Sequence, residues 1–174
     1  GGDVQFQIGW RGLLSLARRS GEVTRATAKI VYDKDYFLYE EGLEPKLVHR
    51  PYLEGADRGE WKLAYFVGQL RDGEPQIEVM TRSESEKVKE FAKKKLGKGF
   101  SFSPWATWEE EMIRKTVAKR GLKWCPQSIE LAKALEVDNA QETGEAMPDF
   151  AAFTTPALPE PQAAPELSAT ERAK

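Results

Sequence analysis

The chain has 174 residues, which is enough for one domain with a buried core, and about 40% of them are hydrophobic. No apolar run is long enough to span a membrane or resembles a signal peptide, so we expect a soluble intracellular protein. The formal net charge is −2, and the single cysteine, Cys125, excludes an internal disulfide and a cysteine-based zinc site.

The first half of the chain consists mainly of segments with the alternation and the β-branched residues typical of strands. Between the first two such segments lies a helix predicted over residues 11–20, which Gly21 ends. One side of this helix is expected to carry Leu13, Leu14, Leu16 and Ala17. An Asp72-Gly73 turn joins the last two strands as a hairpin. The predicted strands cover residues 4–10, 23–32, 36–39, 47–48, 61–70 and 76–81.

From Thr81 onward the hydrophobic period changes to that of helices. Thr81 and Glu84 have the spacing of a capping box, which predicts a helix that runs to about Leu96. A glycine-containing loop follows. The residues of this helix expected to face the core are Val88, Phe91 and Ala92.

Two further helices complete the predicted fold. Ser103 and Pro104 open the first, which weakens at Gly121 or stops before Pro126, and residues 128–135 form a short last helix. Strands followed by helices, without regular alternation, indicate an α+β fold in which helices pack on an antiparallel sheet.

The end of the chain differs from the rest in composition. Residues 136–174 are rich in Pro, Ala and Glu, which predicts a disordered tail that can be removed with little loss of stability. Residues 131–174 carry eight acidic and three basic residues, so residues 1–130 are slightly basic. We therefore expect a core at residues 1–135 and an acidic tail at residues 136–174.

Three consecutive carboxylates, Glu109, Glu110 and Glu111, are the first candidate site. On a helix they point about 100° apart, so they cannot converge on one metal ion. Their place at a helix start offsets the dipole, and pairs with Arg114 and Lys115 have the favourable i,i+4 order. A structural role is therefore favoured over a metal site, and no cofactor is expected.

A glycine-flanked lysine, Lys98, is the second candidate. The segment lacks the earlier glycine and the following Ser or Thr of a phosphate-binding P-loop, so an ATP site is rejected. The same loop and the lysines before it could still contact a DNA backbone, or they could be a solvated charge run.

A row of lysines in the last long helix is the third candidate. Lys115, Lys119 and Lys123 are spaced i, i+4, i+8, so they form one ridge, with Trp108 near it. Such a ridge suits a single-stranded backbone, but taken alone the pattern favours solvated lysines beside a core tryptophan. Reversing Lys115 and Lys119 to Glu is expected to weaken DNA binding without unfolding. His49 is interpreted as a hydrogen-bonded structural residue.

Six segments together resemble the RecT family of single-strand annealing recombinases of phages and prophages, in order and in spacing. They are "QIGWRGLLSLARRSG", "KLVHRP", "AYFVGQLRDG", "VMTRSE", "PWATWEEEMIRKT" and "KWCPQSIE", within about residues 4–135. The resemblance implies an ATP-independent, non-enzymatic DNA-binding protein that coats single-stranded DNA and anneals it to a complementary strand. It also implies rings or helical filaments, a partner exonuclease, host single-strand-binding protein, and the cytoplasm of a bacterial host.

By the same resemblance, the family holds DNA in a positively charged groove beside an N-terminal lobe, which this chain is expected to lack. Arg11, Arg19, Lys115 and Lys123 inherit a DNA-facing or groove-shaping role. The full set of candidate DNA contacts is Arg11, Arg18, Arg19, Lys94, Lys95, Lys98, Trp105, Lys115, Lys119, Arg120 and Lys123. Two alternatives stay open: a metal-dependent nuclease that uses Glu109–Glu111 with aspartates, and a scaffold that binds another protein through its acidic tail.

Overall fold

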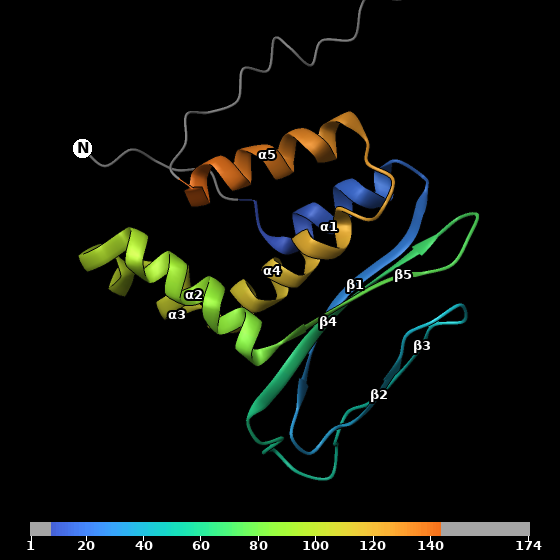
Figure 1. Ribbon diagram of the computed structural model, residues 1–174, viewed down its shortest axis with the longest axis horizontal. Coiled ribbons are helices and arrows are strands. Elements are labelled where there is room, and N and C mark those ends of the chain that lie inside the picture. The colour runs from blue at the N-terminus through green and yellow to red at the C-terminus, as the bar shows by residue number, and fades with distance from the viewer. Residues whose placement is uncertain (1–7, 144–174) are drawn as a thin grey trace, which may run out of the picture.

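The computed structural model describes residues 8–143, with side chains as far as residue 140 (Figure 1). Most of the strand expected at residues 4–10 lies outside this range, and Trp10 begins a helix instead. Residues 144–174 of the expected tail also lie outside it. Within the described range the fold is α+β with antiparallel sheets and packed helices, as the sequence predicts.

The strands form two separate antiparallel sheets. A three-stranded sheet has the order β1–β4–β5, and a two-stranded hairpin pairs β2 with β3. The bounds are β1 (Val23–Tyr32), β2 (Tyr36–Glu40), β3 (Lys46–Arg50), β4 (Trp61–Leu70) and β5 (Gln76–Thr81). These bounds agree closely with the segments predicted from alternation and β-branching.

The helices gather on one face of the three-stranded sheet, and the β2–β3 hairpin lies beside the other (Figure 1). Helices α1 and α4 contact the sheet directly, and α5 packs against α1. The helical elements are α1 (Trp10–Arg19), α2 (Arg82–Leu96), the 3-10 helix η1 (Gly97–Phe102), α3 (Pro104–Thr107), α4 (Glu109–Leu122) and α5 (Ile129–Thr143).

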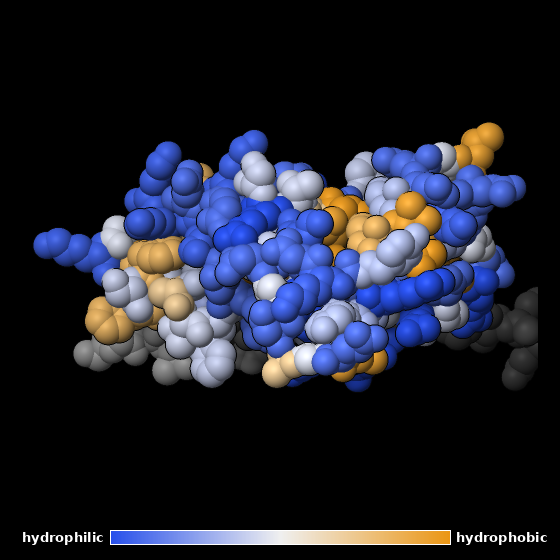
Figure 2. Space-filling model, turned by 90° about the horizontal axis from the view of Figure 1, so that it is seen from below, coloured by the Kyte–Doolittle hydropathy of each residue, from blue (hydrophilic) through white to orange (hydrophobic). Residues whose placement is uncertain are grey.

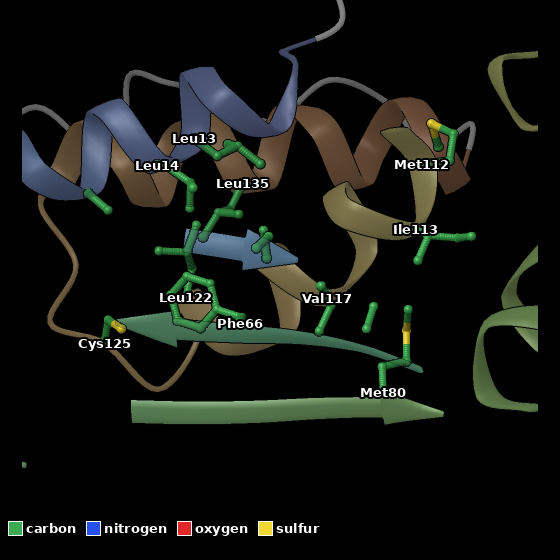
Figure 3. Packing of buried hydrophobic residues seen from close by; sticks show 14 of the residues in the cluster. Leu13, Leu14, Phe66, Met80, Met112, Ile113, Val117, Leu122, Cys125 and Leu135 are labelled. Atoms are coloured by element: carbon green, nitrogen blue, oxygen red, sulfur yellow. The ribbon is translucent and has the colours of Figure 1, made fainter. Parts of the chain in front are cut away.

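Alternation along β4 explains how both faces of the sheet are used. Phe66 points toward the helices and is fully buried, whereas its neighbour Tyr65 points toward the hairpin, where its ring lies 5.6 Å from that of Phe37. Figure 3 shows Phe66 against Leu122. A Cβ at Gly121 would lie 2.0 Å from the Phe66 ring, so only glycine allows α4 to approach β4 this closely. Helix α4 ends at Leu122, one residue after Gly121 and before Pro126, as the sequence predicts.

Helix α2 begins where predicted, but the side chains that it buries are not the ones expected. The Thr81 hydroxyl accepts a hydrogen bond from the Glu84 N–H, and the Glu84 carboxylate accepts one from the Thr81 N–H, which completes the capping box. The prediction that Val88 and Phe91 face the core is wrong, because their exposed fractions are 37% and 61%. The buried residue of α2 is Ser85.

The last helix also differs from the prediction. It runs on to Thr143, so it crosses the expected boundary between residues 135 and 136. Leu131 and Leu135 join the main core cluster, and Asp138 is 1% exposed. Residues 136–143 are therefore part of the folded unit.

Candidate nucleic-acid interface

The predicted groove residues do not line one common cavity. Arg11, Arg19, Lys115 and Lys123 line four different cavities. Arg18 is exposed on α1 outside these cavities. Three exposed lysines at the end of α2 and in η1 also lie outside them: Lys94, Lys95 and Lys98.

Two lysines of the expected ridge are buried beneath α5. The Nζ atoms of Lys115 and Lys119 lie 2.6 and 2.9 Å from the two carboxylate oxygens of Asp138, and their side chains are only 5% and 9% exposed. The expectation of a solvent-facing ridge is therefore wrong for both, and only Lys123 is exposed. Reversing the charge of these two lysines should unfold the domain, because it places carboxylates against buried Asp138.

The aromatic and arginine candidates on α3 and α4 are also fixed by contacts. Trp105 is 6% exposed and belongs to the core, so its ring is not available for base stacking in this structure. Trp108 and Trp124 are instead 65% and 69% exposed. The Arg120 guanidinium pairs with Glu78 at 2.7 Å and with Glu84 at 3.0 Å, which joins α4 to β5 and α2.

The three consecutive glutamates reach different partners, as helical geometry predicts. Glu109 pairs with Lys89 at 2.6 Å and Glu110 pairs with Arg114 at 3.0 Å. Glu111 accepts a hydrogen bond from the Trp10 indole N–H at 2.6 Å. It also pairs with Arg114, not with Lys115 as predicted.

The carboxylate of Glu110 is further held by a hydrogen bond from the Tyr32 hydroxyl at 2.7 Å. This bond and the Arg114 guanidinium keep the pKa of Glu110 below its usual range against the effect of burial. In the part of the chain that the structure describes, no three His, Cys, Asp or Glu side chains are grouped so as to hold a metal ion.

A cationic cleft of about 570 Å³ brings together residues from several elements. It lies where β1, the open edge of the three-stranded sheet, meets α1, the start of α4 and the β2–β3 hairpin. Its positive residues come from four separate elements or loops: Arg11, Lys29, Arg58 and Arg114. The remaining lining includes Trp10, His49, Tyr65 and one carboxylate, Glu111.

The four cations of the cleft are held in different ways. The Arg58 guanidinium pairs with Asp35, whose side chain is fully buried, and Arg114 is held by two glutamates. Arg11 lies over the Trp10 ring at 5.0 Å. Lys29 is exposed on β1, and within the described residues neither Arg11 nor Lys29 has an ion-pair partner. These two cations are therefore available to neutralise an anion from solution.

A buried network anchored on Asp35 supports the floor of the cleft. His49 contacts the Tyr65 hydroxyl through Nδ1 at 3.0 Å and the Asp35 carboxylate through Nε2 at 3.1 Å, so it is hydrogen-bonded as expected. Burial alone would raise the pKa of Asp35. Hydrogen bonds from Arg58, the Tyr52 and Tyr32 backbone N–H groups and His49 outweigh burial and hold this pKa well below its usual range.

The sequence predicted only Arg11 among the four cations of the cleft. Lys29 alternates with the buried Ala28 and Ile30 on β1, so its exposure could be read from the strand pattern. Arg58 lies in a loop with no periodicity, and only the fold brings it to Asp35. Its contribution could not be found from local sequence.

Comparison with known proteins identifies the family of the chain. The sequence model of the RecT family matches residues 1–150. Protein RecT of Escherichia coli (strain K12) is 41% identical over 139 residues, which are 80% of this chain and 49% of that protein. The chain thus spans about half the length of this relative. No helix in residues 8–143 is long and apolar enough to cross a membrane. On the breadth of the family match and this identity, the chain belongs to the RecT family.

Proposed function

We propose that the chain binds single-stranded DNA in the cationic cleft and anneals it to a complementary strand without ATP, in phage-type homologous recombination. The observation that carries this is the cleft itself, in which Arg11 and Lys29 face solvent without a carboxylate partner among the described residues. Membership of the RecT family supports the same conclusion.

The mechanism follows from charge and shape. Two DNA strands repel each other through their phosphates, and each cation that neutralises a phosphate releases a counterion and lowers that repulsion. Arg58 and Arg114 are held by ion pairs that use only part of their guanidinium donors, so both still present N–H groups to the cleft. Contacts to the backbone leave base edges open for pairing.

Aromatic side chains extend this surface. Trp10 lines the cleft and is half-buried, and Trp108 lies in an adjoining cavity that shares Trp10 and Glu111 with the cleft. Stacking of bases on such rings is tolerant of sequence, as annealing requires. No bond is made or broken, so we propose a binding protein and not an enzyme.

The proposal also covers the partners of the chain and its location in the cell. Single strands would be supplied by an exonuclease, neighbouring copies would line up along the strand in a ring or helical oligomer, and host single-strand-binding protein would be a contact. All of this would take place in the bacterial cytoplasm. The exposed Arg18, Lys94, Lys95, Lys98 and Lys123 stay predictions for additional phosphate contacts outside the cleft.

An annealing assay tests the proposal. Complementary labelled oligonucleotides are mixed without ATP, and the rate of duplex formation is compared with and without the chain. We expect acceleration that is lost in an Arg11→Gln, Lys29→Gln variant and retained in a control that replaces Lys46 and Lys62, two exposed lysines outside the cleft. Absence of acceleration by the wild type contradicts the proposal, and magnesium-dependent loss of strands would support a nuclease instead.

A further inference from the structure

Large apolar side chains are exposed at the end of the molecule formed by α2 and η1. Phe91, Leu96 and Phe102 are 61%, 47% and 91% exposed, although large apolar residues are normally covered when they cluster. Lys94 is one helical turn from Phe91 and lies on the same side of α2. We call this surface, Phe91, Leu96 and Phe102 with the exposed lysines 93, 94 and 98, the α2 patch.

The turn of the β2–β3 hairpin has the complementary character. Leu43 is 95% exposed at this turn. It is surrounded in sequence by three exposed carboxylates, Glu40, Glu41 and Glu44. We call residues 40–44 the acidic tip. A leucine at a loop tip gains nothing from full exposure, so this residue is suited to burial against another surface.

The two surfaces lie at opposite ends of the long axis. In Figure 1 the acidic tip lies at one horizontal extreme and the end of α2 at the other. Figure 2 shows apolar residues both at the α2 end and at the opposite extreme. One copy therefore cannot join its own two surfaces, but the tip of one copy can contact the patch of the next.

We propose that the acidic tip of one copy docks its Leu43 side chain against the exposed apolar side chains of the α2 patch of the next copy, with the three tip carboxylates facing the patch lysines. This inference deepens the proposed function, on which it rests, by naming the surfaces that join neighbouring copies. Because the two surfaces differ, the contact is head-to-tail, so it closes into a ring or continues as a filament.

Charge and chemistry favour a second copy as the occupant. The acidic tip and the α2 patch both belong to this chain. Negative charges surround the exposed leucine of the tip, and positive charges surround the exposed apolar residues of the patch. Opposite charges accelerate encounter and fix orientation, while burial of the leucine stabilises the contact. The contact should therefore weaken with added salt but persist in part, unlike a purely ionic one.

Two single variants test the proposal without disturbing the core: Leu43→Ser removes the apolar centre of the tip, and Phe102→Ser removes that of the patch. Assembly is measured by sedimentation velocity and mass photometry, without DNA and in low salt. We expect each change to raise the protein concentration needed for assembly at least about tenfold. Leu53→Ser, which replaces a leucine that is 85% exposed elsewhere, is the matched control and should leave assembly unchanged.

A mixture of the two variants tests the proposal more stringently than either variant alone. The Leu43→Ser chain keeps a working patch and the Phe102→Ser chain keeps a working tip, so an equal mixture should form pairs and no larger species. A wild-type chain that stays monomeric, or a loss of assembly in only one of the two variants, overturns the proposal. A chain that assembles but does not bind oligonucleotides contradicts the proposed function alone, so the two failures can be told apart.

Discussion

Replacing Asp138 by Asn should destabilise the whole domain, although this residue lies in a segment whose composition predicts disorder. Asp138 is 1% exposed and its two oxygens contact Lys115 and Lys119 at 2.6 and 2.9 Å. Removing one charge from a buried ion pair costs roughly 3–5 kcal/mol, because the opposite charge stays in a medium of low polarity. For a chain of 174 residues this corresponds to a drop in Tm on the order of 10 °C.

Thermal unfolding followed by circular dichroism measures this drop. The matched control is Glu136→Gln, the same carboxylate-to-amide change on the same helix, which should shift Tm by no more than about 1–2 °C. Because the Asp138 cluster is shielded from solvent, raising the salt concentration should change the deficit little. If the Asp138→Asn variant has the same Tm as the Glu136→Gln variant, the cluster does not hold α5 in place and the reasoning is refuted.

Three further perturbations should give defined results. Gly121→Ala should lower stability by about 1–3 kcal/mol in denaturant unfolding, because its Cβ would overlap the Phe66 ring, whereas Gly99→Ala, with open space around it, should not. The depressed pKa of Asp35 contributes stability that is fully present above the unfolded-state value of about 3.9 and is lost as pH falls toward the lower folded-state pKa. The stability difference between wild type and Asp35→Asn should therefore be constant from neutral pH to about 5 and shrink below about 4; a difference that grows on acidification contradicts the assignment. Burial raises the pKa of the Cys125 thiol to about 11, so iodoacetamide should label native protein slowly and unfolded protein fast, and rapid native labelling would show that this region opens.

Much of the fold could be predicted from local pattern. The bounds of β1, β4 and β5 follow from β-branched residues and turn signals, and the capping box at Thr81 marks the start of α2. These features depend on neighbouring residues, so the sequence contains them directly. The buried face of α2 could not be predicted in this way, because Phe91 has the spacing of a core residue but no described element covers it.

The candidate site could be predicted less well from the sequence, because it depends on contacts between distant segments. The i, i+4, i+8 spacing places Lys115, Lys119 and Lys123 on one ridge, but it does not reveal that Asp138 from a later helix covers two of them. A carboxylate in a segment rich in Ala and Glu gives no local sign of burial. Likewise, the cleft unites Arg11 and Lys29 with a loop arginine only through tertiary contacts.

The salt dependence of single-stranded DNA binding is the most direct test of the cationic cleft. The affinity for a labelled oligonucleotide is measured by fluorescence anisotropy over a range of salt concentrations, for wild type, for the Arg11→Gln, Lys29→Gln variant, and for the Lys46→Gln, Lys62→Gln control. If both cleft residues contact phosphates, the double variant should bind more weakly, and the slope of log K against log salt should fall in magnitude by about 1.4, roughly 0.7 for each lost contact. An unchanged slope in the cleft variant, or an equal loss in the control, would contradict the placement of DNA in this cleft.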